Sequence, residues 1–340
     1  MDVRGLLRPA PVLVLRLAVA ALLLNVLLVA TGAAVRLTGS GLGCPTWPRC
    51  TSGSLVNTPE LGAHGYIEFG NRLLAVGLEV VGVLLLLAVR RSSVRLPPSW
   101  SRLAAVQVLV VPLQAVIGGI LVLTHLNPYV LIGHFLVSFP LLLAAAVLVR
   151  RALDGPGPRV LLARPELRWL TGALLLSTTL VLVAGTLVTG TGPHAGSVAV
   201  PRLPFDPRSV TQLHADAVFL LVGLTLATAL AARGLGAPPA VRTAVRALVV
   251  LEVAQAALGY LQYFTGTPPL LAGVHVLTAA VVFATAAWAY LSTSGRAPHE
   301  ADDAPRTPLL ISDDLADRHG HRAPPAPVTT SDLAGLSAPS

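Results

Sequence analysis

The chain has 340 residues, of which 54% are apolar and only 12% are charged, and its mean hydropathy is +0.73. Ordinary soluble domains carry roughly twice that charged fraction. The net charge of +8 does not indicate nucleic-acid binding, because every basic residue is Arg and most lie in short segments between apolar runs. The composition excludes an ordinary soluble domain and predicts a polytopic protein of the lipid bilayer.

Eight apolar runs are long enough to cross a bilayer, since about twenty helical residues span its hydrocarbon core. The first run is too long for a secretory signal and no A-x-A cleavage site follows it, so we expect it to be retained. The expected fold is all-α, with eight transmembrane helices at approximately 12–34, 64–89, 103–123, 128–150, 169–189, 211–232, 243–263 and 269–291.

The distribution of Arg predicts the orientation of these helices. Arg residues gather at the N-terminus and after the second, fourth, sixth and eighth runs, whereas the alternate loops hold only Arg36, Arg49, Arg202 and Arg208. By the positive-inside rule, both termini are expected in the cytoplasm of a bacterial cell. The protein is therefore expected in the cell membrane, with these four Arg residues outside.

The two halves of the chain repeat each other. Gln114 and Gly118 in "LQAVIGG" match Gln255 and Gly259 in "AQAALGY". The ends of the first and fifth runs read "LTGSG" and "VTGTG". Four spans duplicated in the same orientation predict two tandem four-helix bundles, a parallel internal repeat.

These matches divide the chain into three parts. We expect a first four-helix repeat at 1–151 and a second at 152–293. The segment 294–340 is rich in Pro, Ala, Asp and Ser without periodicity, so we expect a disordered cytoplasmic tail. Three of the nine His residues, His299, His319 and His321, lie in this tail.

Two His residues of the second half lie at similar depth, His214 and His275, four to six residues inside the expected outer ends of the sixth and eighth runs. A strongly polar group within a span is costly and is commonly functional. Two His on facing helices can be the axial ligands of a haem iron, or each can form only hydrogen bonds between helices. The first half offers His134, which follows Gln114 by the same twenty residues that separate His275 from Gln255.

The second ligand of the first half is missing. Counted back from His134, the 61-residue spacing of the second-half pair leads close to Asn71, which is 63 residues away and is a poor iron ligand. His64 lies seven residues earlier, about two helical turns toward the outside and on the same face. A single ligand from His134 and recruitment of His64 both remain open.

Glu68 lies one helical turn from both His64 and Asn71, so the three share one stripe. Glu68 can form a salt bridge with Arg72, four residues on, in the favourable order. Alternatively, it projects into the bundle toward a bound cofactor or substrate, where a desolvated carboxylate could move protons.

The only two Cys residues, Cys44 and Cys50, lie in the expected outer loop "GCPTWPRC". An outside location permits a disulfide. A zinc site would need two more ligands, and the loop offers no obvious ones. The pair is therefore either a structural staple or a redox-labile dithiol.

Taken together, these features resemble the haem A synthase family over roughly residues 10–292. The resemblance lies in eight spans in two repeats, His at matching depth, a Cys pair in the first outer loop and the motif "E-x-x-N-R". The segment "TGTGPHAG" around His194 is also similar to the family's second outer loop. Many members have His in place of Asn71, so this chain is an Asn variant of the first-half ligand motif.

The resemblance implies an oxidoreductase of cytochrome oxidase assembly that converts haem O to haem A by successive hydroxylations of a methyl group to formyl. It implies a haem B with axial ligands His214 and His275, and Glu68 as the essential acid. Cys44 and Cys50 would match loop cysteines that pass reducing equivalents. The implied partners are a haem O synthase and an electron donor, and a homo-oligomer is left open. The substrate haem would lie in the first half, near His134, His64, Asn71 and Arg72.

Two other classes of function share some of these features. A membrane b-type cytochrome would carry electrons without modifying haem, but it needs no asymmetry between halves, whereas the acid, the Cys loop and Asn71 occur only in the first half. A transporter with parallel repeats would have helix breaks or charged residues near mid-membrane. Pro112 and Pro140 are the only candidates for breaks, and the ionisable groups are expected to cluster at the outer end instead.

Overall fold

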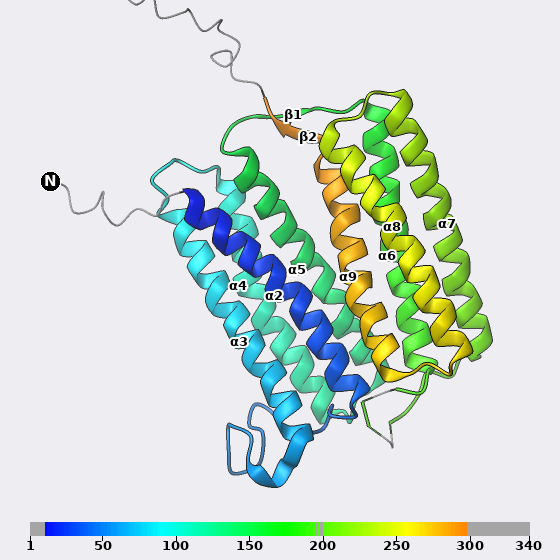
Figure 1. Ribbon diagram of the computed structural model, residues 1–340. Coiled ribbons are helices and arrows are strands. Elements are labelled where there is room, and N and C mark those ends of the chain that lie inside the picture. The colour runs from blue at the N-terminus through cyan, green and yellow to red at the C-terminus, as the bar shows by residue number, and fades with distance from the viewer. Residues whose placement is uncertain (1–10, 195, 198–199, 298–340) are drawn as a thin grey trace, which may run out of the picture. The chain divides into compact units, whose positions relative to one another are not determined.

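The computed structural model describes residues 11–194, 196–197 and 200–297. These residues form eight helices that are long and apolar enough to cross a membrane, which confirms the predicted all-α polytopic fold (Figure 1). The helices are α2 Pro11–Leu37, α3 Gly62–Arg90, α4 Pro98–Leu123, α5 Pro128–Asp154, α6 Pro165–Thr191, α7 Pro207–Gly234, α8 Pro239–Phe264 and α9 Pro269–Leu291.

Each predicted span lies inside one observed helix, and most helices extend beyond it by several residues. In α4, α6, α7 and α8 most of the extension is the first helical turn, which contains Arg and so carries little hydropathy signal, whereas in α2 and α5 it lies at the C-terminal end. Proline marks these starts instead, because its missing N–H group is not needed in the first turn. The helix-starting prolines between α4 and α9 are Pro98, Pro128, Pro165, Pro207, Pro239 and Pro269.

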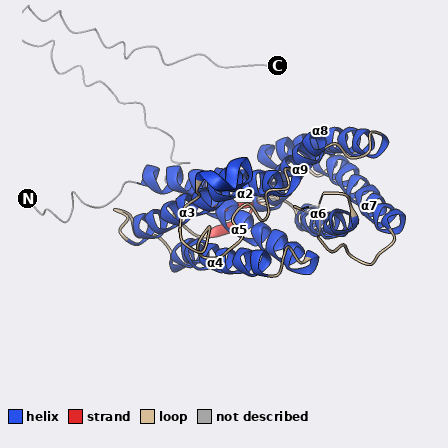
Figure 2. Ribbon diagram, turned by 90° about the horizontal axis from the view of Figure 1, so that it is seen from below, coloured by secondary structure: helices blue, strands red, loops and turns tan. Residues whose placement is uncertain are grey.

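The helices pack in two groups of four. In the first group α2 and α4 each pack against α3 and α5, and in the second α6 and α8 each pack against α7 and α9. The groups meet where α9 packs against α2 and α5, and where α5 packs against α6 (Figures 1 and 2). Two tandem bundles would pack in this way, while their origin by duplication remains a prediction.

Apolar side chains fill each group and the contact between them. Leu85 and Leu148 are buried within the first group, and Leu174 and Leu248 within the second. A third cluster joins the groups and contains Phe139 of α5 and Phe283 of α9, whose rings meet edge to face with centroids 5.0 Å apart. Such aromatic pairs hold two helices at a defined distance.

Pro112 and Pro140 lie inside α4 and α5, which continue through them without a break, as the predicted spans do. One short segment differs from the prediction. Ser294–Arg296, predicted to begin the disordered tail, instead forms strand β2, which pairs antiparallel with β1, Arg159–Leu161. A three-residue strand has no local signal, because its partner lies far away in the sequence. Residues 298–340, with the rest of the predicted tail, lie outside the described residues.

The loops that carry the candidate site gather at one end of the helices, which we call the disulfide end. It contains the ends of α2, α4, α6 and α8, the starts of α3, α5, α7 and α9, and the short helix η1, Pro59–Leu61. This end is the lower one in Figure 1, and the β1–β2 pair lies at the opposite end.

Candidate functional site

Three His side chains lie within the helices close to the disulfide end. His134 is on α5, His214 on α7 and His275 on α9, and each stands six or seven residues after the proline that begins its helix. With a rise of about 1.5 Å per residue, the three imidazoles lie at about the same depth. The matched depth that the sequence predicted is therefore present for all three.

Each of these imidazoles packs against a glycine of a neighbouring helix. A Cβ atom built on the facing glycine would lie 3.2 to 3.7 Å from Cε1 of the ring. The glycines are Gly118 for His134 (3.3 Å), Gly185 for His214 (3.2 Å) and Gly259 for His275 (3.7 Å). A side chain at these positions would compete with the ring for space. Glycine lets the imidazole lie directly on the helix backbone, which restricts its orientation.

The two matched Gln residues make the same hydrogen bond in both groups. Gln114 Nε2 donates to the carbonyl oxygen of His134 at 2.9 Å, and Gln255 Nε2 donates to that of His275 at 3.1 Å. Each bond joins the glycine-bearing helix to the histidine-bearing helix at the level of the ring. Gln114 and Gln255 therefore position the backbone from which the imidazoles project.

The ring nitrogens of the three His are differently occupied. His214 Nδ1 lies 3.1 Å from the carbonyl oxygen of Val181, to which it can only donate. In the neutral ring this leaves Nε2 with a free lone pair, the arrangement seen at metal-binding His. The Nδ1 atoms of His134 and His275 are buried and lack a hydrogen-bond partner, which is uncommon for buried polar atoms.

Asn71 is bonded to a neighbouring helix. Its Oδ1 accepts a hydrogen bond of 2.7 Å from Thr31 Oγ1 of α2. When "LTGSG" is matched to "VTGTG", Thr31 corresponds to Leu182, the residue after the Val181 that contacts His214. Asn71 and His214 thus contact positions of α2 and α6 that are one residue apart in the match. The contact supports Asn71 as the counterpart of His214, with a helix–helix hydrogen bond in place of a free ligand atom.

His64 lies in the first turn of α3, with its side chain exposed. Its Nδ1 is 2.9 Å from Ser40 Oγ in the loop that follows α2. The structure thus places His64 in the loop packing at the disulfide end, about two turns from Asn71 and away from the depth shared by His134, His214 and His275.

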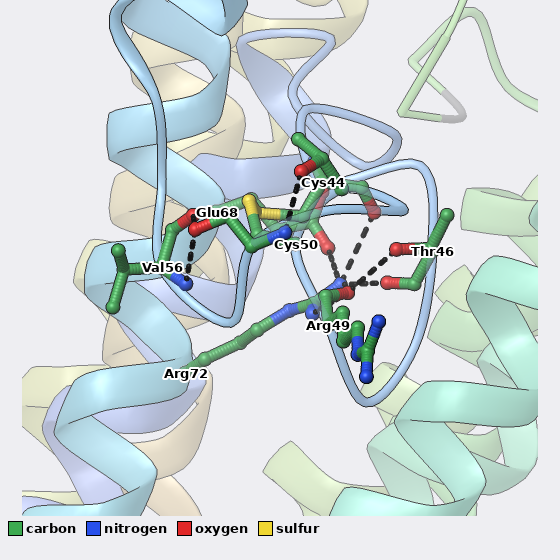
Figure 3. The surroundings of a disulfide bond; sticks show 9 residues. Cys44, Thr46, Arg49, Cys50, Val56, Glu68 and Arg72 are labelled. Atoms are coloured by element: carbon green, nitrogen blue, oxygen red, sulfur yellow. Dashed lines mark hydrogen bonds and ion pairs between the residues drawn. A yellow bond between two sulfur atoms is a disulfide. The ribbon is translucent and has the colours of Figure 1, made fainter.

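Cys44 and Cys50 form a disulfide, and both are fully buried. The loop that they close folds over the start of α3, so the disulfide lies beside Glu68 and Arg72 (Figure 3). The disulfide permitted by the sequence is therefore present in the structure.

Glu68 and Arg72 form a salt bridge, one of the two alternatives that the sequence left open, with Oε1 of Glu68 2.6 Å from Nη2 of Arg72. Glu68 is only 5% exposed, and its Oε2 accepts a hydrogen bond of 2.7 Å from the N–H of Cys44. Arg72 donates to the carbonyl oxygens of Cys44, Thr46 and Arg49 at 3.2 to 3.3 Å (Figure 3). Two side chains one helical turn apart thus clamp the disulfide loop onto α3.

A match to a known family decides what kind of protein this site belongs to. The family model described as cytochrome oxidase assembly protein, COX15-CtaA, matches residues 15–287. The chain belongs to this family. The match covers nearly all of α2 to α9 and includes the three His within the helices, the disulfide loop and the Glu68–Arg72 pair.

Curated relatives are similar over most of their length. Proteins named "Heme A synthase" from Listeria monocytogenes serotype 4a and Listeria innocua serovar 6a are 30% identical to this chain over 271 residues, which cover 74% of this chain and 86% of theirs. A "Heme A synthase" from Staphylococcus epidermidis is 27% identical over 270 residues, covering 76% of this chain and 88% of its own. The resemblance to the haem A synthase family is confirmed.

Two acidic residues lie deep in the helices, contrary to the prediction that ionisable groups cluster at the outer end. Glu252 is buried in the middle of α8, where its Oε1 accepts a hydrogen bond of 2.7 Å from Thr225 Oγ1 of α7. Glu79 of α3 is half-buried, and its Oε2 is buried without a partner. Each stands alone among apolar residues in the sequence, and this isolation is the signal that indicates an acidic residue within a membrane span.

Proposed function

We propose that the protein is a haem A synthase, an oxidoreductase that oxidises a methyl group of haem O to formyl by successive hydroxylations. Family membership and the names of the relatives support this reaction. The observation that carries the proposal is the set of three depth-matched imidazoles, each lying on a glycine and each with a ring nitrogen left for a ligand.

The second half, 152–293, would hold a haem B with His214 and His275 as axial ligands. The residues fit this group, because the Val181 carbonyl orients one ring and the other has a buried nitrogen without a partner. Haem supplies one-electron chemistry at its iron when bound. The protein contributes the orientation of both rings and an apolar surrounding that excludes water.

The first half, 1–151, would hold the substrate haem O, with His134 as the imidazole within its helices that is not exposed. Asn71 is engaged with Thr31, and His64 is engaged with Ser40 at the surface. A haem ligated from one side keeps its other side accessible, which suits oxidation chemistry better than a closed two-His site. The Asn variant is therefore consistent with a half that performs the reaction.

Glu68 would be the acid–base residue of this reaction. Its two oxygens are fixed by Arg72 and by the N–H of Cys44, so the carboxylate holds one orientation beside the bundle's first half. A carboxylate held in this way can take up or release a proton at a defined point. Cys44 and Cys50 would accept two electrons and two protons from an external donor when their disulfide is reduced.

The arrangement in the cell follows from the Arg distribution. We propose that the protein lies in the cell membrane with both termini in the cytoplasm and the disulfide end outside. A disulfide is favoured on that side. The haem O would come from a haem O synthase in the same membrane.

The decisive experiment expresses the chain with and without a haem O synthase and separates the non-covalent haems of the membranes by chromatography. Haem A or a hydroxylated haem O, formed only when both proteins are present, is the expected result. Haem B alone in both cases would overturn the synthase proposal and favour an electron-carrying b-type cytochrome, which needs only the His214–His275 pair.

A further inference from the structure

Four Arg residues lie in or beside the loops of the disulfide end, where Arg is otherwise scarce. Two of them, Arg49 and Arg208, have no buried donor without a partner. Arg49 donates to the carbonyl oxygen of Ser52 within the disulfide loop. Arg208 is exposed in the first turn of α7. Arg36 and Arg202 differ from both, because they donate to the carbonyl oxygens of Thr189 and Pro193, four residues apart, which brings two positive charges into one region of the disulfide end.

Both guanidinium groups of this pair keep a donor without an acceptor. Arg36, the last residue but one of α2, donates from Nη2 to the carbonyl oxygen of Thr189 on α6 at 3.0 Å, but its Nε is buried and unpaired. Arg202 donates from Nη2 to the carbonyl oxygen of Pro193 at 2.6 Å, and its Nη1 is buried and unpaired.

No acidic side chain offsets these charges within the described ranges, where the ion pairs found involve other residues. Two repelling cations with buried, unpaired N–H groups are unfavourable unless an anion lies between them. Carboxylates and phosphates are the anions that guanidinium groups bind best, because two parallel N–H groups match two oxygens.

The position of the pair indicates which anion this is. Leu37, the neighbour of Arg36, packs against α9, since a Cβ atom on Gly273 would lie 3.3 Å from Leu37 Cδ1. Gly273 is two residues before His275, and Thr189 lies one helical turn beyond Gly185, on which His214 rests. The Arg pair therefore lies on the disulfide-end side of the two second-half His residues.

We propose that Arg36 and Arg202 bind the propionate carboxylates of the haem held by His214 and His275. This inference rests on the proposed function. It makes α2, a helix of the first half, part of the cofactor site of the second half, and it gives Arg36 a role in holding the two groups of helices together through a shared ligand. A phospholipid phosphate has the same chemistry and is the competing occupant.

The test compares haem B with haem B dimethyl ester, whose propionates carry no charge. Each is reconstituted into the purified full-length chain, and its transfer to excess apomyoglobin is timed through the low-spin spectrum that only a two-His site produces. We expect the ester to leave the unsubstituted chain about tenfold or more faster than haem B, the range for hydrogen bonds to a charged group. In the double variant Arg36→Gln/Arg202→Gln both haems should leave at the same fast rate.

Arg208→Gln is the matched control, because it removes one positive charge from the same side of the membrane, and it should keep the preference for haem B. If the double variant does not fold, Arg202→Gln alone tests the site, because Arg202 lies in a loop. This single variant should reduce the preference for haem B over its ester at least threefold. A preference that survives in these variants overturns the proposal. A second result would also overturn it: phosphatidylglycerol co-purifies with the unsubstituted chain and is lost from the variants, while the variants still prefer haem B to its ester.

The two proposals fail in different ways. Equal rates for haem B and its ester in the unsubstituted chain would overturn the propionate site and leave the haem A synthase proposal standing. A chain that forms no low-spin complex with either haem would overturn both.

Discussion

The two groups of helices have the same histidine environment at one position but different residues at the partner position. His134 and His275 each lie on a glycine and are supported by a Gln of the preceding helix. At the partner position the second group has His214, whose ring donates to a carbonyl of α6, and the first has Asn71, which binds Thr31 of α2. The comparison shows how one side of a ligand site is removed without disturbing the helix packing around the other.

The loops at the disulfide end also differ between the two halves. The first-half loop is closed by a disulfide and clamped by Glu68 and Arg72. In the second half the corresponding loop is held by His194, whose Nε2 lies 2.8 Å from the carbonyl oxygen of Thr267. The disulfide and the Glu68–Arg72 clamp thus lie in the half that has Asn71 in place of a second imidazole, which supports the proposed division between a reacting half and a cofactor half.

The largest effect is expected from the two proposed haem ligands of the second half, His214 and His275. His214→Ala or His275→Ala should abolish the low-spin haem B spectrum, because a two-His site then keeps one ligand. The measurement is the visible and electron paramagnetic resonance spectrum of the purified chain. His134→Ala should leave this spectrum in place, as should His125→Asn in an exposed loop. A low-spin signal that depends on His134 and not on His214 would reverse the assignment of the two halves.

Glu68→Gln should lower the conversion of haem O by about 10²- to 10⁴-fold, the usual contribution of a positioned acid or base. Gln keeps the shape of Glu and an oxygen for the N–H of Cys44, so the loop should stay in place. The rate is measured as haem A formed in membranes that contain a haem O synthase. Glu79→Gln removes the same charge from the same helix and serves as the control. Equal losses in both variants would argue against a catalytic role for Glu68.

Asn71→His converts the first half toward the second and should add a low-spin haem signal. We expect haem A formation to fall to about a tenth or less, because the second imidazole closes the accessible side of the iron. Asn71→Ala is the control, since it also removes the bond from Thr31, at a cost of about 1 kcal/mol of stability, without adding a ligand. If Asn71→His forms haem A at the original rate, the open side is not needed.

The smallest effect is expected from Ala substitutions at the two matched glycines, Gly118 and Gly259. A Cβ atom at Gly118 would lie 3.3 Å from the His134 ring, whereas one at Gly259 would lie 3.7 Å from the His275 ring. Gly118→Ala should therefore shift the ring by a few tenths of an ångström and lower thermal stability, while Gly259→Ala should be neutral or stabilising by up to about 1 kcal/mol, because Ala favours helix. Thermal unfolding in one detergent gives both values, and the opposite order would contradict the packing described for the rings.

The sequence by itself determined the eight helices, because a bilayer core leaves backbone hydrogen bonds no partner except within a helix. It also determined which His residues share a depth, since a regular helix converts sequence distance into height. Proline marked most helix starts. These features are local, so each can be read without knowing the neighbouring helices.

The tertiary structure decided the partners of the polar side chains. Glu68 reaches the N–H of Cys44, Asn71 binds Thr31, and Glu252 binds Thr225 across helices. These contacts join residues that are 24 to 40 positions apart, and Arg36 meets a carbonyl 153 positions away. No periodicity encodes such pairs, because they depend on how helices rotate and pack. The chemistry of the site was therefore visible in the sequence as residue types, but its connections exist only in the folded protein.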